Sequence, residues 1–175
     1  PRPTPVGKDG GMPTTPTVPQ FGALLRSHIS SVPDAARPAF LSGLERSAAA
    51  RYREWAEAVP DHAEVLLACA AREDEIADLV AELFPVEPDL QRAVDEALPA
   101  AVERYYDVFS PYDVLDQLYL QSEAELQGAQ AWVGIAAGIG DDDANAATRA
   151  TLARCTELEQ QSAAAVKELL AAAGH

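Results

Sequence analysis

Apolar side chains recur at intervals of three and four residues along most of this chain, which is the spacing of one face of an α-helix. The first run predicts a short amphipathic helix, with its apolar face formed by Phe21, Leu24, Leu25, His28 and Ile29. The later runs predict four long helices, over residues 37–59, 61–84, 111–137 and 141–174. The pattern therefore predicts an all-α domain in which the short helix caps a four-helix bundle.

Residues that favour helix ends mark the boundaries of the long helices. Pro60 ends the first, and Asp61 followed by Glu64 has the spacing of a capping box that begins the second. Ser110 and Pro111 offer an N-cap and a proline at the first helical position, so we expect the third long helix to begin there.

The fourth long helix follows Gly138 and Gly140, which end the third, and it closes at Gly174. The acidic run 141–143 places negative charge where it complements the helix dipole. A calcium loop is the alternative, but alternating ligands, a glycine at the sharp turn and a glutamate at position 12 are all missing. Capping is therefore the favoured role of these aspartates.

Residues 85–111 form a long connection between the second and third long helices. We expect short helical pieces at 90–97 and 100–108, interrupted by Pro99. A four-helix bundle needs such a crossover when its second and third helices are not adjacent antiparallel neighbours. The connection also carries four aromatic residues that either cover the bundle or form a dimer contact: Tyr105, Tyr106, Phe109 and Tyr112.

Composition supports the helical prediction and excludes several classes of function. Alanine supplies 35 of the 175 residues, whereas residues 1–19 hold six of the thirteen prolines and predict a flexible arm, with residues 20–175 forming the domain. The 13 basic and 28 acidic residues give a net charge of -15, which disfavours nucleic acid and anionic membranes as partners. Two cysteines are too few for a disulfide framework, so we expect a cytoplasmic protein.

The second and fourth long helices carry related buried faces. Alternating steps of four and three give Leu66, Cys69 and Glu73 in one helix, and the equivalent residues lie 86 positions later in the other. The first and third long helices agree more weakly. This repetition indicates an internal duplication of a helical hairpin.

Each long helix places one glutamate on the face that we expect to be buried: Glu45, Glu73, Glu125 and Glu159. A buried ionised carboxylate is costly unless it is paired, protonated or bound to a metal. The alternative is that each glutamate lies at the rim with its carboxylate in water. Four occurrences at equivalent positions favour the interior, where one carboxylate per helix is the layout of a di-metal site.

These helices resemble the rubrerythrin-type members of the ferritin-like superfamily. Residues 45–52 read ERSAAARY, close to the E-x-x-A-x-x-R-Y pattern of the family's first helix. Residues 71–77 read AREDEIA and, together with Ala70, follow A-x-x-E-x-x-H-A except at the histidine, and residues 157–162 read ELEQQS against E-x-E-x-x-H. The resemblance implies a ferritin-like four-helix bundle with Glu45, Glu73, Glu125 and Glu159 at the metal-ligand positions.

The chain departs from the family at both ligand histidines, which are replaced by Ile76 and Ser162. A cage of glutamates alone would take hard cations such as Mn, Mg or Ca, and would take Fe less readily than one with imidazole. Without metal, the carboxyls must share protons or pair with nearby arginines, for which the candidates are Arg46, Arg51, Arg72 and Arg154.

Three functions remain open at this point. The leading hypothesis is a ferritin-like protein with a degenerate di-metal site that acts by binding or assembly. The second is a metal-dependent oxidoreductase, of ferroxidase or hydroxylase type, that uses Fe or Mn held by the four glutamates. The third is an unrelated helical adaptor with solvated glutamates. We also expect a homodimer or larger homo-oligomer. The N-terminal arm is expected to be a tail or linker, and contact with a partner subunit is the alternative.

Overall fold

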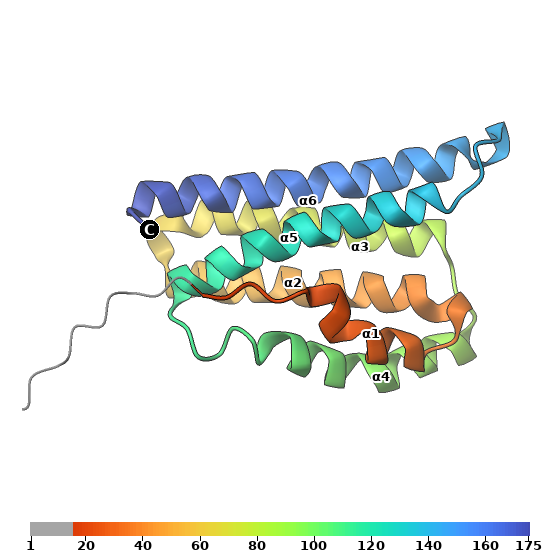
Figure 1. Cartoon of the computed structure of the whole chain (residues 1–175), viewed down its shortest axis with the longest axis horizontal. Helices are drawn as coiled ribbons and strands as arrows, with labels where there is room; N and C mark the ends of the chain where they lie inside the picture. The colour runs from red at the N-terminus through yellow and green to blue at the C-terminus, as the bar shows by residue number, and fades with distance from the viewer. Residues whose placement is uncertain (1–15) are drawn as a thin grey trace, which may run out of the picture.

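The computed structural model describes residues 16–175, and this part of the chain contains helices and no strand, as the sequence predicts. Figure 1 shows the six α-helices, which are α1 (Phe21–Ser31), α2 (Arg37–Ala58), α3 (Ala63–Leu83), α4 (Pro88–Tyr106), α5 (Val114–Ala137) and α6 (Ala146–Ala173). Short 3-10 turns precede α2, α3 and α6, at Asp34–Ala36, Pro60–His62 and Asp143–Asn145.

The four long helices α2, α3, α5 and α6 lie along the long axis of the molecule, with α1 and α4 on the side of α2 that is remote from α6 (Figure 1). The closest packing pairs α2 with α3 and α5 with α6, and the two hairpins meet where α3 packs against α6. Helix α4 contacts both α1 and α2. The short helix α1 therefore packs at the side of the four long helices.

The predicted buried faces are confirmed on the two helices that join the hairpins. On α3, Leu66, Cys69 and Ile76 are fully buried, and on α6 the equivalent Leu152 and Cys155 are fully buried as well. Steps of three and four keep these side chains on one stripe of each helix. They belong to two apolar clusters, one with Leu66 and Cys69 and the other with Ile76, Leu152 and Cys155.

Helix α4 corrects the prediction of two short pieces separated at Pro99. The helix runs without a break from Pro88 to Tyr106 and contains Pro99. Proline removes one backbone hydrogen bond and crowds the preceding turn. Here Pro99 is exposed, whereas Val94 and Ala101 are buried. The packing of Val94 and Ala101 compensates for the cost of a proline inside the helix. A prediction from the position of proline alone does not include this packing.

Two of the predicted helix starts are also wrong in detail. Helix α5 begins after Asp113, whose carboxylate accepts a hydrogen bond from the Asp116 N–H at 3.1 Å, whereas the Ser110 hydroxyl donates to the Asp107 carbonyl. Helix α3 has no side-chain cap, because the residues around Asp61 form a 3-10 turn. A stronger acceptor nearby and a tighter turn therefore replaced the predicted caps.

The ends of the last two long helices agree with the prediction. Helix α5 ends at Gly138, and Asp142 accepts a hydrogen bond from the Asn145 N–H at 3.0 Å, in the turn that leads into α6. Gly174 closes α6 with a φ of 77°, a left-handed conformation that favours glycine. Asp142 thus caps the 3-10 turn, whereas α6 begins at Ala146, later than the predicted start at 141, and has no side-chain cap of its own.

The segment just before α1 lies against the helical body. Residues 1–15 of the predicted arm lie outside the described residues, but Pro16 is buried and Val18 packs against the apolar core. The Gln127 side chain donates to the Pro19 carbonyl and accepts from the Phe21 N–H, both at 2.9 Å. Residues 16–19, which the sequence assigns to the arm, are therefore packed against the helices although they are not helical themselves.

The aromatic residues of the crossover cover the helices, which is one of the two predicted alternatives. Phe109 is fully buried and packs against Phe21, Trp55 and Tyr105, with ring centroids 5.3–6.1 Å apart. None of the described helices is long and apolar enough to span a membrane.

Candidate metal centre

The four glutamates lie near the middle of four different helices, where a charged group is farthest from solvent. Glu45 comes from α2, Glu73 from α3, Glu125 from α5 and Glu159 from α6. Glu73, Glu125 and Glu159 are 0, 3 and 2% exposed, and Glu45 is partly buried. The reading with four solvated glutamates is therefore wrong.

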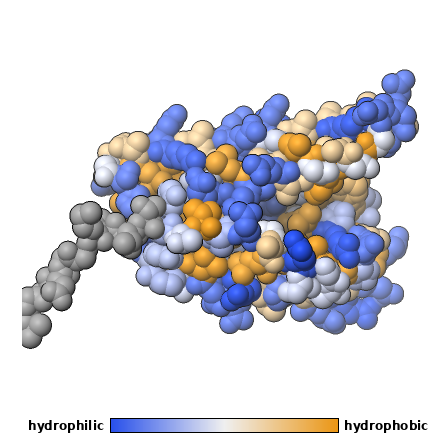
Figure 2. Space-filling view, viewed as in Figure 1, coloured by the Kyte–Doolittle hydropathy of each residue, from blue (hydrophilic) through white to orange (hydrophobic). Residues whose placement is uncertain are grey.

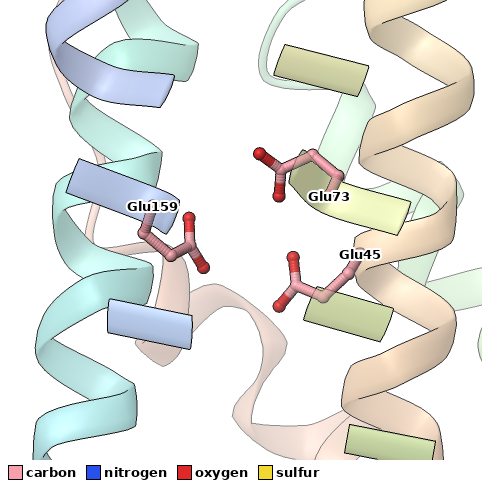
Figure 3. Close-up of side chains that lie close together, drawn as sticks. All are labelled: Glu45, Glu73 and Glu159. Atoms are coloured by element: carbon pink, nitrogen blue, oxygen red, sulfur yellow. The ribbon is translucent and has the colours of Figure 1, made fainter. Parts of the chain in front are cut away.

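Three of the carboxylates meet in one cluster. Figure 3 shows Glu45, Glu73 and Glu159 pointing toward one another, and an oxygen from each lies within 4.8 Å of the others. The convergence follows from the helix register, because the buried stripes of α2, α3 and α6 bring one glutamate each to the same level. Among the described residues, this is the one group with ligand-type side chains at such distances.

Glu125, on α5, is not part of this group of three. Its Oε1 accepts two hydrogen bonds of 2.7 Å, one from the Tyr52 hydroxyl and one from the Gln121 side chain. The charge of Glu125 contributes to the raised pKa of Glu73 and Glu159. Two neutral donors therefore fix one oxygen of Glu125.

Glu159 is held by a donor on the neighbouring helix and fits a space left by a glycine. The Trp132 indole N–H donates to its Oε1 at 3.0 Å. A Cβ at Gly128 would lie 2.5 Å from the same oxygen, closer than side chains pack. The carboxylate thus lies where only a glycine on α5 leaves room.

Glu73 has one satisfied and one unsatisfied oxygen. The Ser162 hydroxyl donates to its Oε1 at 3.0 Å, whereas Oε2 is buried without a hydrogen-bond partner. A buried polar atom without a partner typically costs about 1–3 kcal/mol, more if it is charged. The arrangement therefore leaves a strong acceptor in the interior, beside other acceptors.

The arginines near these glutamates in the sequence do not neutralise them. Arg46 pairs with Asp78, Arg51 with Glu54, and Arg154 with Glu75 and Glu157. Arg72 donates to the Cys69 sulfur at 3.5 Å. No ion pair within residues 16–175 includes any of the four clustered glutamates, so the arginine-pairing alternative is wrong.

Burial and repulsion by neighbouring carboxylates raise the pKa of Glu45, Glu73 and Glu159 and so favour their protonated form when no cation is present. Burial raises the pKa of Glu45 from 4.5 to about 8, and the charge of Glu125 adds to the rise. Burial also raises the pKa of Glu73 and Glu159 well above the ordinary value, reinforced by the other glutamates. The carboxyls of the cluster therefore carry protons that a bound cation would displace.

Histidines take no part in this cluster. Ile76 is fully buried in an apolar group with Val80 and Trp132, and Ser162 is fully buried beside Glu73. The cluster of ligand-type groups contains carboxylates alone. Within the described residues, the structure brings three of the four predicted ligands together, Glu45, Glu73 and Glu159.

The two cysteines are free and buried, and they lie in different parts of the core. Burial raises the pKa of the Cys69 thiol to about 12 and that of Cys155 to about 11. Because the thiolate is the nucleophile and the metal ligand, these values favour a packing role for both side chains.

Sequence reasoning found the four glutamates but missed several residues that support them. Gln121 donates a hydrogen bond to Glu125, and Ser162 donates one to Glu73. Helix periodicity does not predict these two bonds, because they depend on side-chain geometry. Gly128 offered a signal, because a glycine inside a helix costs up to about 1 kcal/mol and often marks close packing. Tyr52 is fully buried, and its hydroxyl donates a hydrogen bond to Glu125.

Comparisons with protein-family models, with curated proteins and with solved structures gave no match to this chain.

Proposed function

We propose that this protein is a ferritin-like helical protein that binds a divalent metal through Glu45, Glu73, Glu125 and Glu159. The observation that carries the proposal is the buried Oε2 of Glu73, which lacks a hydrogen-bond partner, on a carboxyl that is grouped with those of Glu45 and Glu159. A cation between these groups would satisfy that oxygen and remove the repulsion among the glutamates. Protonation is the competing solution, so binding would release protons.

The donor set fits some metals better than others. Carboxylate oxygens suit Mn²⁺, Mg²⁺ and Ca²⁺, whereas imidazole and thiolate favour Zn²⁺, Cu²⁺ and tightly held Fe²⁺. The space at Gly128 supports the fit, because it gives the Glu159 carboxylate its place in the cluster. We therefore expect Mn²⁺ to bind more tightly relative to Fe²⁺ than it does in sites that contain histidine. A bound metal would supply Lewis-acid chemistry.

A role in binding or assembly, without di-iron catalysis, is supported by the residues at the two histidine positions. Ile76 offers no donor atom, and the Ser162 hydroxyl is engaged with Glu73. A site of glutamates alone lacks the two histidine ligands that the resemblance implies for a redox-active pair of iron ions. A homodimer or larger homo-oligomer remains part of this proposal, with the N-terminal arm as a candidate contact to a partner subunit.

The test is titration of the metal-free full chain with Mn²⁺, followed by calorimetry and by the loss of the free Mn²⁺ EPR signal. We expect saturable binding that Glu73→Gln weakens at least about tenfold, since it removes a charged ligand. Glu75→Gln is the matched control, because Glu75 lies on the same helix with its side chain 44% exposed. No binding, or equal binding by both variants, would overturn the proposal.

A metal-dependent oxidoreductase is the second candidate, and Tyr52 favours it. This fully buried phenol donates to Glu125, so a redox-capable side chain lies directly against the carboxylate cluster. Anaerobic loading with Fe²⁺ followed by exposure to oxygen separates the two functions. Stoichiometric oxygen consumption that depends on Glu45 and Glu159 would support the oxidoreductase, whereas metal binding without oxygen consumption would support a binding role.

A further inference from the structure

An apolar cavity of about 160 Å³ lies beside the glutamate cluster, between α2 and α5. Leu41, Leu44 and Ala48 of α2 form one wall, and Ala124, Trp132 and Ile135 of α5 form another. Helix α1 contributes Phe21, Leu25 and Ile29. Figure 2 shows hydrophobic residues gathered along the middle of this face, between the upper and lower helices.

The polar groups in the cavity wall are acidic or neutral. Glu45, Glu125 and Glu159 line it, and no lysine, arginine or histidine occurs among its lining residues within the described chain. The fourth clustered glutamate, Glu73, is not part of the wall. A molecule in the cavity would therefore meet three carboxyls at one place and apolar side chains elsewhere.

Aromatic rings add a second feature that favours positive charge. Phe21, Tyr105, Tyr106 and Trp132 all contribute to the lining. Ring faces attract ammonium groups, by about 0.5–2 kcal/mol depending on how far the cation is desolvated. One ring already serves in this way outside the cavity, since the Arg51 guanidinium lies 4.4 Å from the ring centre of Tyr106.

The cavity volume limits the size of its occupant. A cavity of about 150 Å³ lined by aliphatic and aromatic side chains is large enough for benzene. The observed 160 Å³ therefore suits a body of about six to eight non-hydrogen atoms. Longer chains would have to extend past Ala131, which lines the cavity and is exposed.

We propose that this cavity binds a small organic ammonium ion, with its apolar body between α2 and α5 and its charged nitrogen at Glu45 and Glu159. An ammonium ion would stabilise the ionised form of the Glu45 and Glu159 carboxyls and displace their protons, whereas an uncharged molecule or an anion supplies no positive charge to offset their burial. The inference uses three of the glutamates of the proposed metal site, so the metal and the ammonium ion compete. It does not require the metal site to exist, because the metal-free cluster offers the same carboxyls.

The experiment titrates the metal-free full chain with benzylamine and with benzyl alcohol, its neutral counterpart of equal size. Binding is followed by calorimetry and by changes in tryptophan fluorescence, since Trp132 lines the cavity. We expect the amine to bind at least about tenfold more tightly than the alcohol, as for hydrogen bonds to charged groups. Equal affinities, or binding of the alcohol alone, would overturn the proposal.

Two variants locate the binding. Ala48→Leu fills the interior of the cavity, and Ala131→Leu narrows its exposed rim, where misfolding is not expected. Both should weaken benzylamine binding while Mn²⁺ binding persists, and Val133→Leu, on the exposed face of the same helix, should change neither. Benzylamine binding unaffected by Ala48→Leu and Ala131→Leu would place the ligand elsewhere and overturn the inference.

The two proposals fail in distinguishable ways. Benzylamine binding without Mn²⁺ binding would support the ammonium site and overturn the metal site. Mn²⁺ binding without benzylamine binding would do the reverse. If both bind, Mn²⁺ should displace benzylamine, because Glu45 and Glu159 belong to both sites. Simultaneous, independent binding would contradict the placement of the ammonium nitrogen.

Discussion

Gly128 on α5 faces the carboxylate of Glu159 on α6 so closely that a Cβ at position 128 would lie 2.5 Å from Oε1 and 2.9 Å from the carboxyl carbon. The glycine leaves the space in which a buried charge-bearing group sits, at the cost of helix propensity. The same oxygen accepts the Trp132 indole N–H. The position of the Glu159 carboxylate is thus fixed by the hydrogen bond from Trp132 and by the absence of a side chain at Gly128.

We predict that Gly128→Ala displaces the Glu159 carboxylate and weakens Mn²⁺ binding about tenfold or more, as expected when a ligand or its support is disturbed. Calorimetric titration of the purified variant measures the effect. The variant should also lose the indole hydrogen bond, so the fluorescence of Trp132 should change.

Gly134→Ala is the control for this prediction. It lies on the same helix, and a Cβ there would meet nothing within 4 Å. Removing a glycine from a helix interior typically adds about 0.5–1 kcal/mol of stability. We therefore expect a higher Tm and unchanged Mn²⁺ affinity. Equal affinities for both variants would mean that the contact with Glu159 has no role in binding.

The metal-free protein should lose stability as the pH rises from about 4.5 to about 8. Burial raises the pKa of Glu45 to about 8 in the folded state, so the native protein holds a proton that the unfolded chain releases above 4.5. Because the native state binds more protons in this window, the free energy of unfolding falls with increasing pH. Urea denaturation across this range measures the slope.

Glu45→Gln should flatten this dependence, whereas Glu168→Gln, an exposed substitution on α6, should leave it unchanged. Excess Mn²⁺ should also restore stability at pH 8, by about 2.7 kcal/mol at a hundred times its Kd. Stability that increases steadily from pH 4.5 to 8 without metal would contradict the raised pKa.

Tyr52→Phe should destabilise the protein by about 1–3 kcal/mol. The hydroxyl is buried and donates to Oε1 of Glu125 at 2.7 Å, so its removal leaves an acceptor with one donor instead of two. Thermal and chemical denaturation measure the loss. Tyr119→Phe is the control, since Tyr119 is only partly buried. An equal, small effect of both variants would show that the Tyr52 hydroxyl contributes nothing specific.

The glutamate cluster was predictable because helix periodicity fixes which residues share a face. The steps of four and three that place Leu66 and Cys69 in the core also place Glu73 there, and the duplicated pattern does the same for Glu159. Those steps assign each glutamate to the buried face of its helix, and the structure brings three of them together, Glu45, Glu73 and Glu159.

Features that depend on competing energies were not predictable in this way. Pro99 signals a break, but the continuous helix is retained while Val94 and Ala101 pack on its buried face. Ser110 and Asp113 are both good N-caps, and the choice of Asp113 depends on the turn that precedes α5. The cavity depends on how far α2 and α5 stand apart, which periodicity does not specify.

Ser162→His should increase affinity for metals that favour imidazole. Ser162 already reaches Glu73 with its hydroxyl at 3.0 Å, so a histidine there would place nitrogen donors at the edge of the cluster. We expect a larger gain for Fe²⁺ and Zn²⁺ than for Mn²⁺, measured by competition with a coloured chelator. Adding Ile76→His should increase the gain further.

Ser162→Asn is the control, because it adds a neutral side chain of intermediate size without imidazole. The position is fully buried, so either variant costs stability, and folding is checked first by circular dichroism. If the folded histidine variant bound Fe²⁺ no better than the asparagine variant, position 162 would not face the metal.

Replacing the proline inside α4 should stabilise the protein. Pro99 lies in the helix interior, is exposed and cannot donate the backbone hydrogen bond that an alanine would provide. The intrinsic difference is about 3 kcal/mol, reduced by roughly 1 kcal/mol because alanine gives the unfolded chain more freedom. Pro99→Ala should therefore raise the Tm, as measured by calorimetry.

Pro88→Ala, at the first turn of the same helix, should give no such gain, since proline is well suited to that position. A lower Tm for Pro99→Ala would mean that the proline-induced geometry of α4 is needed for its packing on α1 and α2.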